Sequence, residues 1–201
     1  MLNELRRPYN AVIDFVDANV ARGLGNKIAF IDPERSLTYG GLQARSTRFA
    51  NALRELGVEH EQRVALLLND TVDYPVAFWG TIRAGAVAIP LNTYLPHLQY
   101  AYILNDCRAT ALVVDAALAD MMGPVLETLP RRPIVMVVGS TNQAPSSWPA
   151  GHDGRGTVHH FEDIIATADA TPFTADTLSV YQIEAFPLLT LRYRGYLQGS
   201  P

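Results

Sequence analysis

Few residues in this chain combine the type and the spacing that chemistry requires. Three of the five histidines lie close together, as His152, His159 and His160, but no cysteine pair accompanies them. Zinc sites place such ligands at fixed spacings, so the pattern favours solvated loop histidines over a metal site. The single cysteine, Cys107, follows an expected helix in the sequence NDCRA. We expect it to pack as a small hydrophobic residue rather than to react as a thiolate.

Neighbouring carboxylates occur twice, as Glu55 with Glu59 and as Asp14 with Asp17. Both pairs fall on polar helix faces or in loops, so we expect solvated carboxylates rather than an acid–base dyad. Tyr94 and His97 follow an expected strand, where α/β proteins often place functional groups, but neither is assigned a role. The sequence therefore predicts no catalytic, cofactor-binding or metal-binding residue.

The composition indicates a globular chain with a core of its own. Of its 201 residues, 48% are hydrophobic and 18% are charged, and the net charge is −4. The pI near 5.7 indicates no basic surface, which argues against binding to nucleic acid or to an anionic membrane. The single cysteine, the lack of an amino-terminal signal pattern and the lack of a long apolar run favour a soluble, cytoplasmic protein.

A strand–helix–strand unit in the first half of the chain organises the rest. Residues 63–68 form a continuous apolar run, typical of a strand covered on both faces, and residues 86–89 form a second one. Between them, one apolar helix face is indicated by residues at helical spacing: Val72, Val76, Trp79 and Ile82 or Arg83. We expect Asp70 or Thr71 to cap this helix, and Gly85 to end it in a left-handed conformation.

Similar patterns predict the other elements. The first is an amphipathic helix over 11–20, with Val12, Phe15, Val16 and Val20 at helical spacing. The others are a hairpin over 27–39 with its turn at 32–35, helices over 40–56, 97–105, 116–129 and 161–168, and strands over 111–114 and 134–138. Thr38 is expected to cap the helix over 40–56 and Gly57 to end it, and residues 139–156 read as a surface loop. Strands that alternate with helices predict an α/β fold with a layered, mostly parallel sheet and flanking helices.

Three stretches carry a resemblance to a known family. They are LTYGGLQARSTRFANALRELGV (37–58), VALLLNDTVDYPVAFWGTIRAGAVAIPLNT (64–93) and YAYILNDCRATALVVD (100–115). Together they resemble the N-terminal domain of the adenylate-forming acyl- and aryl-CoA synthetases, and DTVDYPVAFWGTIRAG followed by IPLNT is most similar to the benzoate-CoA ligases. The resemblance extends over residues 11–179 in unbroken order, and it implies that this chain is an incomplete N-terminal domain of that fold.

The resemblance implies a two-step reaction. ATP and an aromatic or other acyl carboxylate give an acyl-adenylate and pyrophosphate, and the thiol of CoA then displaces AMP. Such chemistry needs Mg²⁺ and a loop rich in glycine, serine and threonine, with a lysine, to hold the phosphates. In the family this loop, of the form Y-[ST]-S-G-[ST]-T-G-x-P-K-G, would begin just after Ser179.

The tail over 180–201, VYQIEAFPLLTLRYRGYLQGSP, lacks that loop. Glu184–Phe186 resembles the strand that precedes the loop in the family, but the match is lost from Pro187 onward. Read one base later, allowed codons for 188–201 can encode a Gly/Ser/Thr-rich segment that ends in Lys-Gly. We therefore expect a partial domain over 1–179 and a divergent, frameshifted tail over 180–201. This truncated ligase should be inactive alone and should bind no ATP, Mg²⁺ or CoA tightly.

Two other readings compete with the ligase fragment. A small α/β binding or regulatory module could reuse the scaffold, but the apolar run over 185–191 favours a fragment that needs further core. A Rossmann dehydrogenase is disfavoured because no G-x-G-x-x-G follows a strand. If the fragment reading is right, uncovered strand edges and apolar patches should promote self-association.

Overall fold

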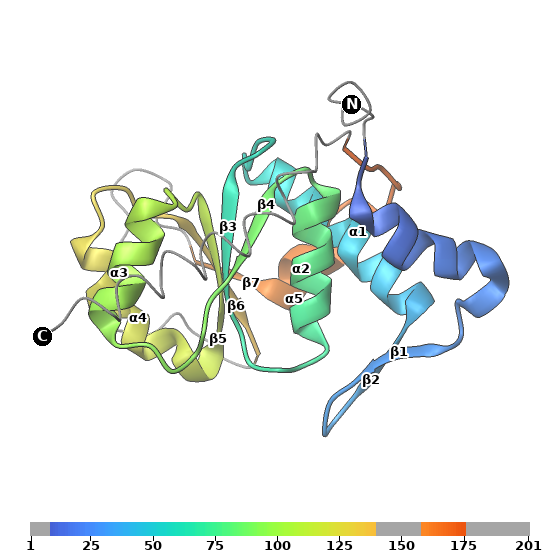
Figure 1. Ribbon diagram of the computed structural model, residues 1–201, viewed down its shortest axis with the longest axis horizontal. Coiled ribbons are helices and arrows are strands. Elements are labelled where there is room, and N and C mark those ends of the chain that lie inside the picture. The colour runs from blue at the N-terminus through green and yellow to red at the C-terminus, as the bar shows by residue number, and fades with distance from the viewer. Residues whose placement is uncertain (1–8, 140–157, 176–201) are drawn as a thin grey trace, which may run out of the picture.

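Five short strands form one parallel sheet in the computed structural model, which describes residues 9–139 and 158–175 (Figure 1). The strands are β3 (Arg63–Leu67), β4 (Val87–Pro90), β5 (Ala111–Asp115), β6 (Ile134–Val138) and β7 (Val158–His160). They lie in the order β4-β3-β5-β6-β7, and all neighbours are parallel. The predicted α/β fold with a parallel sheet is therefore confirmed.

Helices cover both faces of this sheet (Figure 1). On one face, α1 (Tyr39–Glu55), α2 (Asp73–Arg83) and α5 (Phe161–Thr167) share a core with alternate strand residues such as Val64 and Val113. On the other face, α3 (His97–Asp106) and α4 (Ala116–Thr128) pack on the intervening residues, such as Ala65 and Leu112. The strands β3 to β6 thus each contribute to two cores, which explains why these four read as continuous apolar runs.

The N-terminal part is helical as predicted, but its turns are wider than those of an α-helix. Two π-helical segments, η2 (Ile13–Asp17) and η3 (Val20–Leu24), follow each other, and Gly23 lies at φ 84° within the second. Val16 is buried, as its spacing predicts, whereas Phe15 is 57% exposed and stacks on Trp79 of α2 at 5.7 Å between ring centroids. The helical spacing assumed for Phe15 was wrong because a π-helix turns less per residue.

The predicted hairpin forms from β1 (Ile28–Ile31) and β2 (Ser36–Thr38), which pair antiparallel. Thr38 then caps α1 as predicted, because its hydroxyl oxygen accepts a hydrogen bond of 3.1 Å from the Gly41 N–H. Gly57 follows α1 at φ 83°, and Gly85 follows α2 at φ 79°. Both glycines therefore adopt the left-handed conformation that was expected of them.

The predicted cap of α2 is wrong. Val72 occupies the N-cap position, and neither Asp70 nor Thr71 caps the helix. Instead, the Asp32 carboxylate of the hairpin turn accepts a hydrogen bond of 2.9 Å from the Val72 N–H. A residue 40 positions earlier thus satisfies an amide at the start of this helix.

The strand β7 was missed in the sequence, and it corrects the reading of two histidines. His159 and His160 pair with Met136 and Val137 of β6, so they are half-buried strand residues rather than solvated loop residues. Three residues are too short a run for a periodic signal, which explains the error. His152, most of the predicted loop over 139–156 and the tail over 180–201 lie outside the described residues. In the part of the chain described, no helix has the length and apolar character needed to cross a bilayer.

Candidate functional site

The carboxyl ends of the parallel strands are the first place to look for a site. There, the turn after β4 is braced by Tyr100, which is fully buried. Its hydroxyl donates to the Asn92 carbonyl at 2.8 Å and accepts from the Leu95 N–H at 3.1 Å. Tyr94, at the tip, is 93% exposed, and His97 is also exposed. The turn at this edge of the sheet is fixed by hydrogen bonds, but Tyr94 and His97 are exposed to solvent and the described side chains around them do not come together as a site.

The turn between β3 and α2 is a poor phosphate site. Helix N-termini attract phosphate through free backbone N–H groups. Here the Val72 N–H is already bonded to the Asp32 carboxylate, and Asp70 adds a further negative charge. Because both features oppose a phosphate, the described residues at this turn do not fit the ATP that the family resemblance implies.

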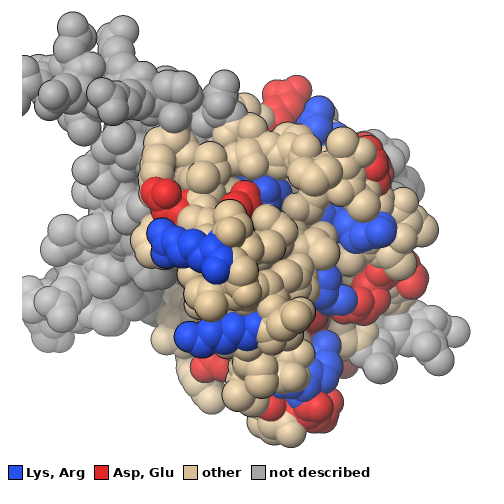
Figure 2. Space-filling view, turned by 90° about the vertical axis from the view of Figure 1, so that its right-hand side faces the viewer, with Lys and Arg blue, Asp and Glu red and all other residues tan. Residues whose placement is uncertain are grey.

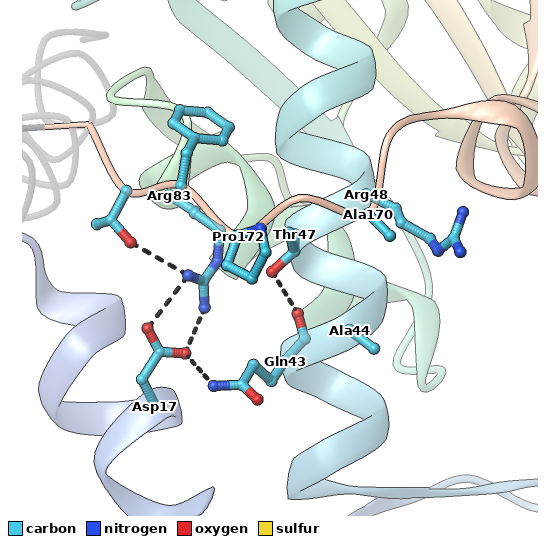
Figure 3. Close-up of a pocket in the computed structure, with 10 residues that line it drawn as sticks. Asp17, Gln43, Ala44, Thr47, Arg48, Arg83, Ala170 and Pro172 are labelled. Carbon is cyan, nitrogen blue, oxygen red and sulfur yellow. Dashed lines mark hydrogen bonds and ion pairs between the residues drawn. The ribbon is translucent and has the colours of Figure 1, made fainter. Parts of the chain in front are cut away.

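A pocket of about 470 Å³ lies at the carboxyl-terminal end of α2 (Figure 3). It is formed by the N-terminal helical segment, by α1 and α2, and by the segment that follows α5. Its lining residues are Asp17, Gln43, Ala44, Thr47, Arg48, Arg83, Ala170, Pro172, Phe173 and Thr174. Four parts of the chain that are far apart in sequence therefore meet at this pocket.

The central group of the pocket is Arg83, whose side chain is 2% exposed. Its two terminal nitrogens bond the two carboxylate oxygens of Asp17, at 2.5 and 3.1 Å, and one of them also bonds the Thr174 hydroxyl at 3.2 Å. Gln43 donates to the same carboxylate at 2.9 Å, and Figure 3 shows Asp17, Gln43 and Arg83 pointing toward one another. The Arg83 charge is thus neutralised in a two-point pair.

This pair corrects the expectation that Asp17 is a solvated carboxylate. Its neighbour Asp14 is exposed, whereas Asp17 is half-buried and bonded to both Arg83 and Gln43. Glu55 and Glu59 are exposed, as predicted. Arg83 was read only as part of an apolar helix face, and nothing in the local sequence indicates its partner 66 positions away.

A second charged cluster joins the hairpin to three helices. Asp73, at the start of α2, accepts hydrogen bonds from Arg35 at 2.8 Å and from Arg45 at 3.0 Å. Arg45 also bonds Glu162 of α5 at 2.6 Å. Burial, the largest influence, lowers the Arg45 pKa, but Glu162 and Asp73 outweigh it, so the net pKa is raised. The Val72 N–H is the main cause of a lowered Asp32 pKa. These opposite charges therefore stabilise each other.

Two side chains with intrinsic reactivity lie elsewhere. Burial raises the pKa of the Cys107 thiol to about 11, which supports its reading as a packed residue. Burial also lowers the pKa of His159. Within residues 9–139 and 158–175, no group of three histidine, cysteine or acidic side chains could hold a metal ion. Figure 2 shows acidic and basic side chains interspersed over the face that carries the N-terminal helices and the hairpin.

Comparison with known proteins places this scaffold in a family. The model of the family described as AMP-binding enzyme matches residues 17–180. The chain is 48% identical over 133 residues to a 4-hydroxybenzoate–CoA/benzoate–CoA ligase of Rhodopseudomonas palustris, and that alignment covers 66% of this chain and 25% of the ligase.

Solved structures agree with the sequence comparison. The anthranilate CoA ligase AuaEII, in complex with anthranoyl-AMP, is 29% identical with a TM-score of 0.74, over 88% of this chain and 31% of that one. A benzoate CoA ligase from Burkholderia xenovorans is 33% identical with a TM-score of 0.68, over 83% and 30%. The chain thus spans 25% to 31% of the length of these three relatives. It belongs to the AMP-binding enzyme family, and its similarity within that family lies with the aryl-CoA ligases.

Proposed function

We propose that this chain is the N-terminal scaffold portion of an aryl-CoA ligase. In such an enzyme, ATP and an aromatic carboxylate form an acyl-adenylate and pyrophosphate, and CoA then displaces AMP to give the thioester. The observation that carries the proposal is the 48% identity to a ligase named for 4-hydroxybenzoate and benzoate. The family match over residues 17–180 supports a partial domain over 1–179, followed by a divergent tail over 180–201.

The contribution of this portion is structural. The Arg83–Asp17 pair and the Asp73 cluster hold the hairpin, the N-terminal helices and the segment after α5 against one face of the sheet. The sequence contains no glycine-rich loop with a lysine, and the β3–α2 turn opposes a phosphate. We therefore expect the 201-residue polypeptide by itself neither to hold ATP tightly nor to form an acyl-adenylate.

A chimera tests the proposal. The part of the Rhodopseudomonas palustris ligase that corresponds to residues 17–180 is replaced by those residues of this chain, and benzoate- and CoA-dependent AMP release is measured. We expect a folded chimera that forms benzoyl-CoA, because the replaced part supplies the scaffold and the rest of the ligase supplies the phosphate loop.

A matched control uses the corresponding part of the long-chain-fatty-acid-CoA ligase from Archaeoglobus fulgidus, which is 21% identical to this chain and shares the fold. That chimera should lose most of its activity with benzoate. If the chimera with this chain melts cooperatively but makes no benzoyl-CoA, the proposal that these residues can serve as the scaffold of a benzoate-activating ligase is wrong.

The origin of the tail is a separate proposal. We attribute the tail from Pro187 onward to an out-of-frame reading of the segment that encodes a phosphate loop. Sequencing of the gene from the codon for Phe186 onward tests this. A shifted frame that encodes the missing motif supports the idea, and an undisturbed reading frame without that motif contradicts it.

The alternative of a small binding module would use the pocket beside Arg83. However, both arginines in its lining already have protein partners. Arg83 is paired with Asp17, and Arg48 donates to the Ala168 carbonyl at 2.9 Å and, in Figure 3, points away from Asp17. The lining of the pocket therefore indicates a contact that holds distant segments together rather than a ligand-binding site.

Self-association of the isolated polypeptide also stays a prediction. The hairpin strand β1 exposes Ile28, Phe30 and Ile31 at 49%, 40% and 74%. Three large apolar side chains exposed on one short strand favour association. Size-exclusion chromatography with light scattering should show dimers or larger species, and a compact monomer at micromolar concentration would contradict the expectation.

A further inference from the structure

Residues 169–175, which we call the strap, follow α5 and form one wall of the pocket beside Arg83 (Figure 3). Four strap residues line the pocket: Ala170, Pro172, Phe173 and Thr174. The strap buries little surface of its own, because residues 169–172 are exposed and residues 173–175 are half-buried. Its attachment therefore depends on the groups that reach it from neighbouring elements.

Asn51 of α1 makes the most direct of these attachments. The residue is 6% exposed, and its side-chain amide donates to the Asp169 carbonyl at 2.7 Å and to the Thr171 carbonyl at 3.1 Å. A side-chain amide has two N–H donors, so both are used on the strap. The acceptors are backbone carbonyls, which means that Asn51 holds the path of the strap rather than one of its side chains.

Two arginines flank Asn51 on the same face of α1, three residues before it and three residues after it. Arg48 donates to the Ala168 carbonyl at 2.9 Å, just before the strap begins. The guanidinium carbon of Arg54 lies 4.3 Å from the centroid of the Phe173 ring, near the end of the strap. A single row of polar side chains on α1 thus follows the strap along most of its length.

The last residues of the strap are bonded to α2 and to the N-terminal part. The Thr174 hydroxyl accepts a hydrogen bond from Arg83 at 3.2 Å, and the Ala175 N–H donates to the Arg83 carbonyl at 3.1 Å. The Asn10 side chain donates to the Ala175 carbonyl at 3.3 Å. Arg83 and Asn10 each bond another group as well, so both side chains stay paired if the strap moves away.

We infer that the strap is a latch, which opens as a unit while α1, α2 and the sheet stay folded. Local opening occurs where few apolar side chains are buried and the hydrogen bonds lie near solvent. The strap meets both conditions, because it is held by hydrogen bonds and by the partly buried Phe173 at the margin of the core. Opening removes four of the ten residues that line the pocket and exposes the Arg83–Asp17 pair.

Native-state hydrogen exchange of the full 201-residue chain tests the inference. The Ala175 amide reports opening of the strap, because its bond to Arg83 must break, and the amides of the central strand β5 report global unfolding. In the unaltered chain, the protection factor of the Ala175 amide should be at least about a hundredfold lower than those of β5. Equal protection would overturn the inference.

A variant on the far face of the sheet separates local from global opening. Met122→Ala destabilises the core beneath α4, so exchange in β5 should become about a hundredfold faster. Exchange at Ala175 should change by less than about twofold, because the strap opens without that core. If Met122→Ala speeds both amides equally, the strap opens only when the whole molecule unfolds, and the inference is wrong.

A variant of α1 tests how the strap is held. Asn51→Ala removes two hydrogen bonds to the strap and should speed exchange at Ala175 about tenfold. Ser46→Ala is the matched control, since Ser46 is also a buried polar residue of α1 but bonds the Gln43 carbonyl of its own helix. It should change exchange at Ala175 by less than about twofold.

Chymotrypsin gives a second readout, which follows the whole strap rather than one amide. Cleavage after Phe173, identified by the mass of the fragment that ends there, requires the strap to leave α1, so its rate tracks the open population. The rate should rise about tenfold in Asn51→Ala and stay the same in Ser46→Ala and Met122→Ala. An unchanged rate in Asn51→Ala, or an equal rise in Met122→Ala, would contradict the latch.

Discussion

Helices α3 and α4 cover one face of the sheet with a mainly apolar core, whereas α1 and α2 share a core that includes buried polar side chains. Seven described polar or charged residues are buried, and all of them lie at position 10, on α1 or on α2: Asn10, Ser46, Thr47, Asn51, Asp73, Thr81 and Arg83. The other core contains Leu, Val, Ala, Met and Ile, with Tyr100 bonded through its hydroxyl.

The two cores differ because one joins elements that are neighbours in the sequence, whereas the other joins segments that are far apart in the sequence. The apolar face is built by α3 and α4 with the strands next to them in the chain. On the polar face, Asn10 bonds Ile82, Asp17 bonds Arg83, and Asn51 bonds Asp169. Apolar contact is non-directional, whereas a buried hydrogen bond fixes a particular partner. Buried polar groups thus specify where the distant segments attach.

The largest effect is expected where a buried charge loses its partner. Asp17→Asn leaves the Arg83 guanidinium buried without a counter-charge and should lower the free energy of unfolding by about 4 kcal/mol. Denaturant titration measures this change. Asp120→Asn, on an exposed position of α4, is the matched control and should change stability by less than about 0.5 kcal/mol.

A double variant separates charge from packing. Asp17→Leu combined with Arg83→Met removes both charges, so it should be clearly more stable than Asp17→Asn alone. If the double variant is instead as unstable as Asp17→Asn, the pair contributes through packing rather than charge. The difference between the two faces would then not be electrostatic.

On the apolar face, the volume of the buried side chains should determine the free energy of unfolding. Met122 of α4 is fully buried, so Met122→Ala should cost about 3 kcal/mol through lost contacts and a cavity. Met122→Leu keeps the volume and should cost less than about 1.5 kcal/mol. The same denaturant titrations apply. Equal losses in the two variants would mean that this core is loosely packed, contrary to the structure.

The polar face also depends on a close approach of two helices. A Cβ built on Gly80 of α2 would lie 2.7 Å from Cδ1 of Phe49 and 2.9 Å from the Ser46 carbonyl oxygen of α1. Gly80→Ala should therefore cost about 2 kcal/mol because the helices must separate. Gly25→Ala is the control, since Gly25 has helical φ and ψ and an ordinary contact of 3.7 Å. A thermal melt in which Gly80→Ala matches Gly25→Ala would refute this packing.

The smallest effect concerns reactivity rather than stability. With its pKa raised to about 11, the Cys107 thiol is almost entirely protonated at pH 8. Its alkylation should be about a hundredfold slower than that of an exposed cysteine, and the rate should rise with pH toward 11. Leu98→Cys in a Cys107→Ala background is the control, because Leu98 lies on α3, the helix that Cys107 follows, and is 84% exposed. Equal rates would show that Cys107 is open to solvent.

The same contrast explains what the sequence could predict. Periodic apolar runs predicted four of the five parallel strands and most of the helices, and local chemistry predicted the Thr38 cap and the left-handed Gly57 and Gly85. These signals are local, because a cap or a helix stop depends on neighbours within one turn.

The rest depends on partners that are distant in sequence. Asp17 and Asp14 look alike in the sequence, yet only Asp17 meets Arg83. Asp32 was read as part of a turn, but it also bonds the first turn of α2. The strand β7 is three residues long, and pairing with β6 rather than its own pattern defines it. A charged residue on an amphipathic helix gives no local sign of whether it faces water or a distant counter-charge.

The most direct test of the proposed role is ATP–pyrophosphate exchange by the purified 201-residue polypeptide, with benzoate present and absent. The account predicts no benzoate-dependent exchange above a protein-free control, because the chain provides a scaffold without a loop to hold the triphosphate. Clear benzoate-dependent exchange by material free of other ligases would contradict it.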